Sequence, residues 1–269
     1  MRSLLPIRVM LLVVALALGV SAGCGSRSLE FEPQSWPGVA SVIRPNPDGG
    51  GYAGTALVSG NRGLTAAHLF YIKDDQLYEG PVYTRGAFAE ARLISHGTVR
   101  EASSAASSEF AESMRRWRED WAAYETIGSE PAPEAAWRPM GYRAHHGNRV
   151  YVVRSRYRRS GERREVASLR IIEPPSSARE DLPENVLIGI ETRRGARLSA
   201  GWSGSFVGRY RTHDDTWEFV GIVVGRLGNK YPHAFVIIRP PEEVIRWLLE
   251  GDASEADGFG EVASEWGGG

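Results

Sequence analysis

Short apolar runs separated by turn signals make up most of the middle of the chain. Turn signals such as Asn46-Pro47-Asp48-Gly49 and Gly60-Asn61 interrupt them, and the runs are rich in β-branched and aromatic residues. No regular alternation of strands with helices is visible, so the pattern predicts an all-β barrel or sandwich. The expected strands cover residues 39–43, 52–58, 62–66, 149–153, 165–172, 186–191, 217–224 and 234–238.

Two segments have the periodicity of helices. One aligns apolar residues on a single face, at Phe110, Met114, Trp117 and Trp121, and predicts a helical insertion near 105–118 that packs against a barrel. The other begins after Pro240-Pro241, runs from Glu242 to Glu250 and stops at Gly251.

The two ends of the chain do not read as part of the folded body. Residues 9–20 form an uncharged apolar run after Arg2 and Arg8, and this run is shorter than the roughly 20 residues of a membrane-spanning helix. Small residues precede the single cysteine, Cys24, so that the segment resembles a bacterial lipoprotein cleavage box, although Ser21 stands where a leucine is usual. The alternative is an ordinary secretory signal.

We therefore expect a signal peptide at 1–23, lipidation of Cys24, a tether at 24–35 and a membrane anchor facing the periplasm or exterior. Residues 251–269 carry five acidic and no basic side chains, which predicts a disordered tail.

Composition narrows the class of protein further. The 269 residues are 42% hydrophobic and 24% charged, which is typical of a globular protein, and a formal net charge of −1 gives no overall attraction to nucleic acid. The lone cysteine excludes an internal disulfide and a cysteine-based zinc site.

Three segments carry candidate chemistry. In the first, a predicted strand pair leads into Thr65-Ala66-Ala67-His68, which leaves an imidazole at a strand end among small residues. In the second, Asp120 precedes an apolar run that can bury it. In the third, Gly201-Trp202-Ser203-Gly204 places a serine in a glycine-flanked turn before a predicted hairpin that turns at 212–215.

Together these segments resemble the trypsin-like (chymotrypsin-fold) serine peptidases, which share Thr-Ala-Ala-His, an Asp before apolar residues and Gly-x-Ser-Gly. The chain order His68, Asp120, Ser203 is that of this family and not of subtilisins or α/β-hydrolases. The resemblance covers about 36–250. It implies two antiparallel six-stranded β-barrels, at 36–127 and 128–250, and a C-terminal helix.

The resemblance also implies roles for the residues. Ser203 would attack a peptide carbonyl, His68 would act as general base, and Asp120 would hold the imidazole tautomer. The backbone N–H groups of Gly201 and Ser203 would form the oxyanion hole. The expected activity is that of a serine endopeptidase on a polypeptide substrate, with no cofactor, no metal and no nucleic acid.

Several residues depart from the family pattern. Trp202 replaces an Asp, Val224-Gly225-Arg226 stands where Ser-Trp-Gly is usual, and Glu119 is an alternative acid beside Asp120. If Arg197 and Arg226 both face the substrate pocket with Val224, an acidic side chain is expected before the scissile bond. The alternative functions are a catalytically inactive binding protein with the same fold and an esterase using the same site.

Two further clusters are candidate binding sites. Six arginines fall within residues 154–164 and could bind nucleic acid or anionic lipid, but a hairpin that turns at Ser160-Gly161 with an exposed arginine face is the preferred interpretation. His145 and His146 could contribute to a metal site, but adjacent side chains on a strand point in opposite directions.

Overall fold

The computed structural model describes most of the chain between residues 33 and 251. The described residues are 33, 35–46, 51–73, 76–84, 89–97, 117–128, 131–140, 144–158, 161–174, 182–227 and 233–251. The expected signal peptide, the lipidation site, almost all of the tether and all but the first residue of the acidic tail lie outside these ranges. Within them, no helix is both long and apolar enough to cross a bilayer.

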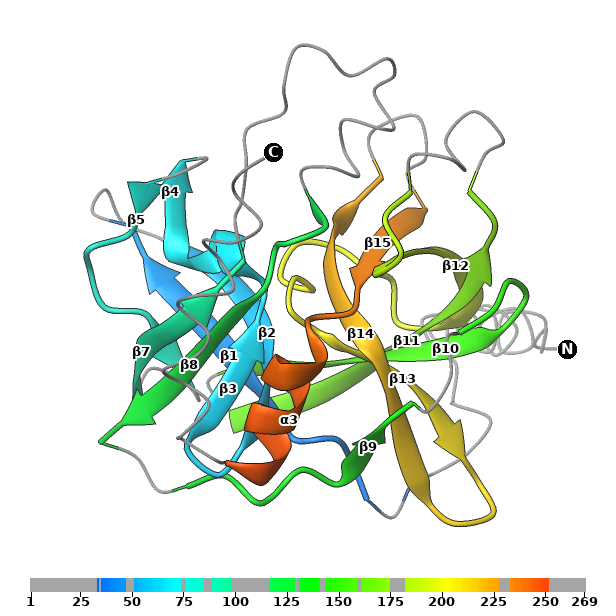
Figure 1. Cartoon of the computed structure of the whole chain (residues 1–269), viewed down its shortest axis with the longest axis horizontal. Helices are drawn as coiled ribbons and strands as arrows, with labels where there is room; N and C mark the ends of the chain where they lie inside the picture. Colours follow the sequence, from blue (N-terminus) through cyan, green and yellow to red (C-terminus); the bar gives the residue numbers. More distant parts are fainter. Residues whose placement is uncertain are drawn as a thin grey trace, which may run out of the picture.

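The first half of the chain closes into a β-barrel, drawn in blue to green in Figure 1. Its strands follow the order β1-β2-β3-β8-β7-β6, with β1 also pairing with β6. A small two-stranded sheet of β4 (Tyr71–Lys73) and β5 (Gln76–Leu77) follows the 3-10 helix η2 (Ala67–Phe70). The barrel strands are β1 (Val39–Pro45), β2 (Gly51–Ser59), β3 (Arg62–Thr65), β6 (Tyr83–Thr84), β7 (Ala89–His96) and β8 (Ala122–Ile127).

The second half forms another antiparallel barrel of six strands. The order is β13-β10-β11-β12-β15-β14, and pairing of β13 with β14 closes it, while the short β9 (Trp137–Pro139) adds a parallel pair to β14. The two-barrel architecture expected from the sequence is therefore confirmed. The strands are β10 (Arg149–Arg158), β11 (Gly161–Ile172), β12 (Val186–Gly195), β13 (Phe206–Arg211), β14 (Thr216–Arg226) and β15 (Ala234–Ile238).

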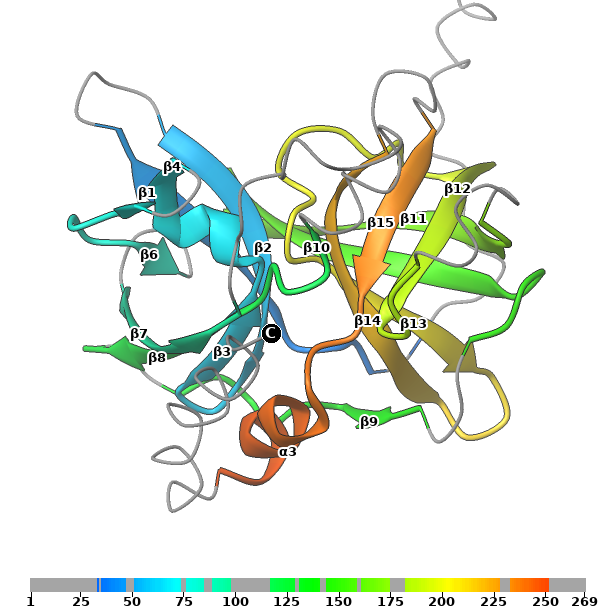
Figure 2. The same cartoon turned by 45° about the horizontal axis from the view of Figure 1, so that its top comes forward.

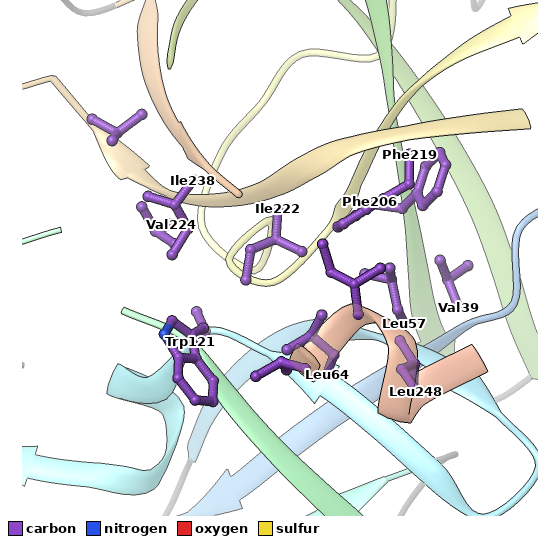
Figure 3. Close-up of a cluster of buried hydrophobic side chains, with 14 of the residues drawn as sticks. Val39, Leu57, Leu64, Trp121, Phe206, Phe219, Ile222, Val224, Ile238 and Leu248 are labelled. Atoms are coloured by element: carbon purple, nitrogen blue, oxygen red, sulfur yellow. The ribbon is translucent and has the colours of Figure 1, made fainter. Parts of the chain in front are cut away.

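A shared hydrophobic cluster joins the two barrels. Figure 3 shows Leu57 and Leu64 of the first barrel facing Phe206 and Ile222 of the second, with Leu248 of α3 (Glu242–Glu250) beside them. All five are fully buried. Burial of each such side chain contributes about 1.5–3 kcal/mol. The helix covers one side of the seam in both views (Figures 1 and 2), so the barrels are packed as one body.

Some local predictions hold and others are wrong. The C-terminal helix has the predicted bounds, and Gly251 ends it with a positive φ of 77°. The predicted helical stripe is wrong at its end: Trp117 is helical, but Trp121 lies outside any helix and directly precedes β8. Phe110 and Met114 lie outside the described residues. His145 and His146 lie in a turn before β10 and not on a strand.

Candidate active site

The histidine lies in a tight turn that follows a strand of the first barrel. β3 ends at Thr65, and His68 is the second residue of η2. Ala66 and Ala67 are fully buried, so the turn packs closely against the barrel, and the His68 side chain keeps 29% of its surface exposed. The imidazole is thereby held by the barrel but open to solvent.

Asp120 is the acid that contacts this histidine. Its carboxylate is fully buried; Oδ2 lies 2.7 Å from His68 Nδ1, and Oδ1 accepts the His68 backbone N–H at 2.8 Å. Because an ionised carboxylate only accepts hydrogen bonds, the proton of the neutral imidazole is on Nδ1 and Nε2 is left as an acceptor. The alternative acid, Glu119, instead pairs with Arg118, 3.1 Å from Nε to Oε1.

The serine lies in the loop between β12 and β13. Gly201 and Gly204, which flank Trp202 and Ser203, have φ values of 86° and 77°, a region that glycine adopts without strain. The Ser203 carbonyl accepts the backbone N–H of Thr55 at 2.8 Å. A Cβ on Gly204 would lie 2.0 Å from the Thr55 carbonyl oxygen. The loop of the second barrel is therefore pressed against β2 of the first.

Gly54 shows how near the serine loop comes to the histidine turn. A Cβ placed on Gly54 would lie 2.4 Å from Leu69 Cδ1 and 2.9 Å from the Ser203 carbonyl oxygen. Leu69 is the residue after His68, so both segments converge on one glycine of β2. The structure thus brings together the three predicted segments: hydrogen bonds join His68 to Asp120, and the Ser203 carbonyl and the Leu69 side chain both pack against Gly54.

The three residues expected to line the substrate pocket differ in their surroundings. Arg197 has 79% of its side chain exposed, with Nη1 4.0 Å from a carboxylate oxygen of Glu191. Arg226 is exposed, and its guanidinium carbon lies 5.8 Å from the centre of the Phe235 ring. Val224 is 1% exposed and packs in the cluster between the barrels, so its side chain does not face an open pocket.

Trp117 contacts the candidate site, although the sequence pattern assigned it only to a packing stripe. Its ring meets the His68 imidazole edge to face, with centroids 5.8 Å apart. Its indole also covers Gly225, where a Cβ would lie 3.1 Å from Cζ2. Gly225 stands where the resembled family has a Trp, and the Trp117 indole from the first half of the chain packs over this glycine. The sequence signal that could have placed Trp117 in the site is its position three residues before Asp120.

Comparisons with known proteins identify the fold. No family model and no curated protein matches the sequence. Among solved structures, a mutant of the tobacco etch virus protease is 12% identical over 84% of this chain and 85% of its own, with a TM-score of 0.51. The catalytically active form of that protease with its product is 12% identical over 84% of each chain, also at 0.51. The active form of the Rv3671c protease from M. tuberculosis is 15% identical over 80% of this chain and 81% of its own, at 0.46. At 12% identity, the likeness to the tobacco etch virus protease shows a shared fold.

Proposed function

We propose that the protein is a serine endopeptidase. The observation that carries this proposal is the buried Asp120 carboxylate that fixes the His68 tautomer beside a glycine-flanked serine loop. The fold is shared with the tobacco etch virus protease, which was solved in its catalytically active form in complex with product. A polypeptide substrate is therefore the favoured class.

The proposed reaction uses the residues of the site as follows. Ser203 Oγ attacks the scissile carbonyl carbon while His68 Nε2 takes the hydroxyl proton. The negative oxygen that forms is stabilised by the N–H groups of Gly201 and Ser203. The C–N bond breaks as the imidazolium gives its proton to the leaving amine, and water then hydrolyses the acyl-enzyme by the same route. Asp120 stabilises the imidazolium throughout.

A fluorophosphonate probe tests the proposal directly, because it phosphonylates only an activated serine. We expect the purified protein to be labelled, and labelling to disappear in Ser203→Ala. Ser199→Ala is the matched control, since Ser199 is an exposed serine of the same loop and should leave labelling unchanged. A folded wild-type protein that takes up no probe would refute the endopeptidase and favour the second candidate.

That second candidate is a binding protein that has the double barrel and no turnover. Trp202 in place of the usual Asp and the exposed Arg226 at the expected cleft favour it. An esterase is distinguished from an endopeptidase by comparing matched ester and peptide substrates: the proposal requires cleavage of the peptide.

We further propose that the protein is exported and anchored to the cell envelope through a lipid on Cys24. The support is the sequence alone: an apolar run of signal-peptide length is followed by small residues and the single cysteine. Metabolic labelling with a fatty acid should mark the wild-type protein and not Cys24→Ala. Label retained by the alanine variant would refute lipidation at this position.

A further inference from the structure

One arginine of the basic hairpin points inward, beneath the serine loop. Val150 and Val152 on β10 face the interior of the second barrel, and Arg154 follows them at the same alternation. It is 5% exposed, whereas Arg156, Arg163 and Arg164 are exposed as the hairpin interpretation expected. A buried guanidinium needs partners, because an isolated charge in a protein interior is strongly destabilising.

The partners of Arg154 come from the neighbouring strand and from the serine loop. Glu165 stands opposite it in the β10–β11 register and accepts from Nε at 2.9 Å and from Nη2. Nη1 donates to the Ala200 carbonyl at 3.3 Å. The guanidinium carbon lies 4.2 Å from the centre of the Trp202 ring, where a cation is attracted to the ring face.

These contacts hold both sides of Gly201. Ala200 precedes it and Trp202 follows it, and a Cβ on Gly201 itself would lie 3.6 Å from Arg154 Nη1. In a trans peptide the C=O and the next N–H point in opposite directions. Since the Ala200 carbonyl is turned toward Arg154, the Gly201 N–H is turned away from it.

We propose that Arg154 is a positioning residue that keeps the Ala200–Gly201 peptide oriented for the oxyanion hole. The inference rests on the proposed peptidase function. If that peptide rotated, its carbonyl oxygen would replace the Gly201 N–H and repel the developing negative charge. Stacking on Trp202 and the hydrogen bond to Ala200 oppose that rotation, and the Glu165 carboxylate fixes the guanidinium so that it can make both contacts.

Trp202 therefore contributes to the proposed site by stacking on the Arg154 guanidinium. At this position the peptidase family pattern has an Asp. Its indole nitrogen is buried with no hydrogen-bond partner in the described part of the chain, and the ring is 1% exposed. The position of the Trp202 ring thus depends on packing and on its stacking against the Arg154 guanidinium. The proposed role of Trp202 and Arg154 is to hold the loop by a stacked cation instead of a carboxylate.

The test is Arg154→Met, which preserves much of the side-chain length but removes the charge and all donors. Arg170→Met is the matched control, because Arg170 is exposed on β11 of the same hairpin. We expect Arg154→Met to lower kcat by about 10²–10³ with little change in KM, since loss of one oxyanion donor has that effect. Fluorophosphonate labelling should slow in parallel, while Arg170→Met stays at wild-type rates.

Two further measurements keep the result unambiguous. Arg154→Lys keeps the charge in a narrower side chain, so it should fold if Arg154→Met does not and should show a partial loss of kcat. A peptide aldehyde, which forms an oxyanion with the serine, should bind more weakly to both variants in proportion to the kcat loss. Folded variants with wild-type kcat and aldehyde affinity would overturn the role of Arg154 and leave the endopeptidase proposal standing. Failure of the wild-type protein to label would instead remove the proposed function itself.

Discussion

Replacing Asp120 by Asn tests the proposed chemistry with the smallest change of shape. The wild-type carboxylate accepts two hydrogen bonds, from the His68 backbone N–H at 2.8 Å and from Nδ1 at 2.7 Å. An asparagine amide has only one accepting oxygen. The backbone N–H can only donate, so it keeps that oxygen, and the NH₂ group is left facing Nδ1.

The consequence is a change of tautomer. Facing an N–H donor, Nδ1 must become the acceptor, so the imidazole proton moves to Nε2, which then cannot take the Ser203 proton. Loss of tautomer control of this kind lowers kcat by about 10⁴-fold, and that factor corresponds to about 5.4 kcal/mol of transition-state stabilisation. KM should change little, because the fully buried Asp120 side chain has no exposed surface with which to contact a substrate.

The assay is steady-state cleavage of a peptide substrate found from a library, with thermal unfolding measured in parallel. Glu119→Gln is the matched control, since Glu119 pairs with Arg118 and should be dispensable. A folded Asp120→Asn protein with kcat within tenfold of wild type would refute the reasoning. So would a large loss in Glu119→Gln, which would point to the neighbouring acid.

Three other predictions follow from the fold and the site. Gly128→Ala, at φ 75° with open space around it, should lower the free energy of unfolding by about 1–2 kcal/mol. Gly204 has a similar φ of 77°, but its added Cβ would lie 2.0 Å from a carbonyl oxygen, so Gly204→Ala should cost about 1–3 kcal/mol more than Gly128→Ala. Equal costs in urea titrations would refute the close packing of the serine loop. Arg62 donates to two carbonyls at the end of α3, so Arg62→Met should lower the free energy of unfolding by about 1.5–3 kcal/mol, and an unchanged urea midpoint would contradict this. If Arg197 and Arg226 face the substrate, peptide libraries should show a preference for Asp or Glu before the scissile bond, which Arg226→Ala weakens by up to about fivefold; a clear preference for Arg or Lys would end the idea.

Much of the architecture could be predicted because local sequence and tertiary fold agree. The strands with continuous apolar runs and the helix that begins after two prolines are signalled by periodicity and by turn residues. β7 and β8 were missed for a physical reason. β7 carries charged and polar side chains at many positions, and β8 begins beside Trp117 and Trp121, whose spacing suggested that a helix continues.

In the candidate site, too, some residues could be predicted from local sequence patterns and others could not. His68, Asp120 and the serine loop could be found because each has its own short pattern. Arg154 could not, because its partners Glu165, Ala200 and Trp202 come together only when the hairpin and the loop pack. Alternation along β10 did contain a partial signal, since it places Arg154 on the face of Val150 and Val152. Trp117 was similarly hidden until the two barrels met.

The hydrogen bond from the Thr55 N–H to the Ser203 carbonyl crosses from one barrel to the other. A nascent chain that has completed only its first half therefore contains the imidazole and the carboxylate but lacks the hydroxyl. The proposed reaction therefore requires both synthesis of the second half and its docking against the first. Assembly of the two halves would thus keep the proposed activity off until the whole body of the protein has been synthesised.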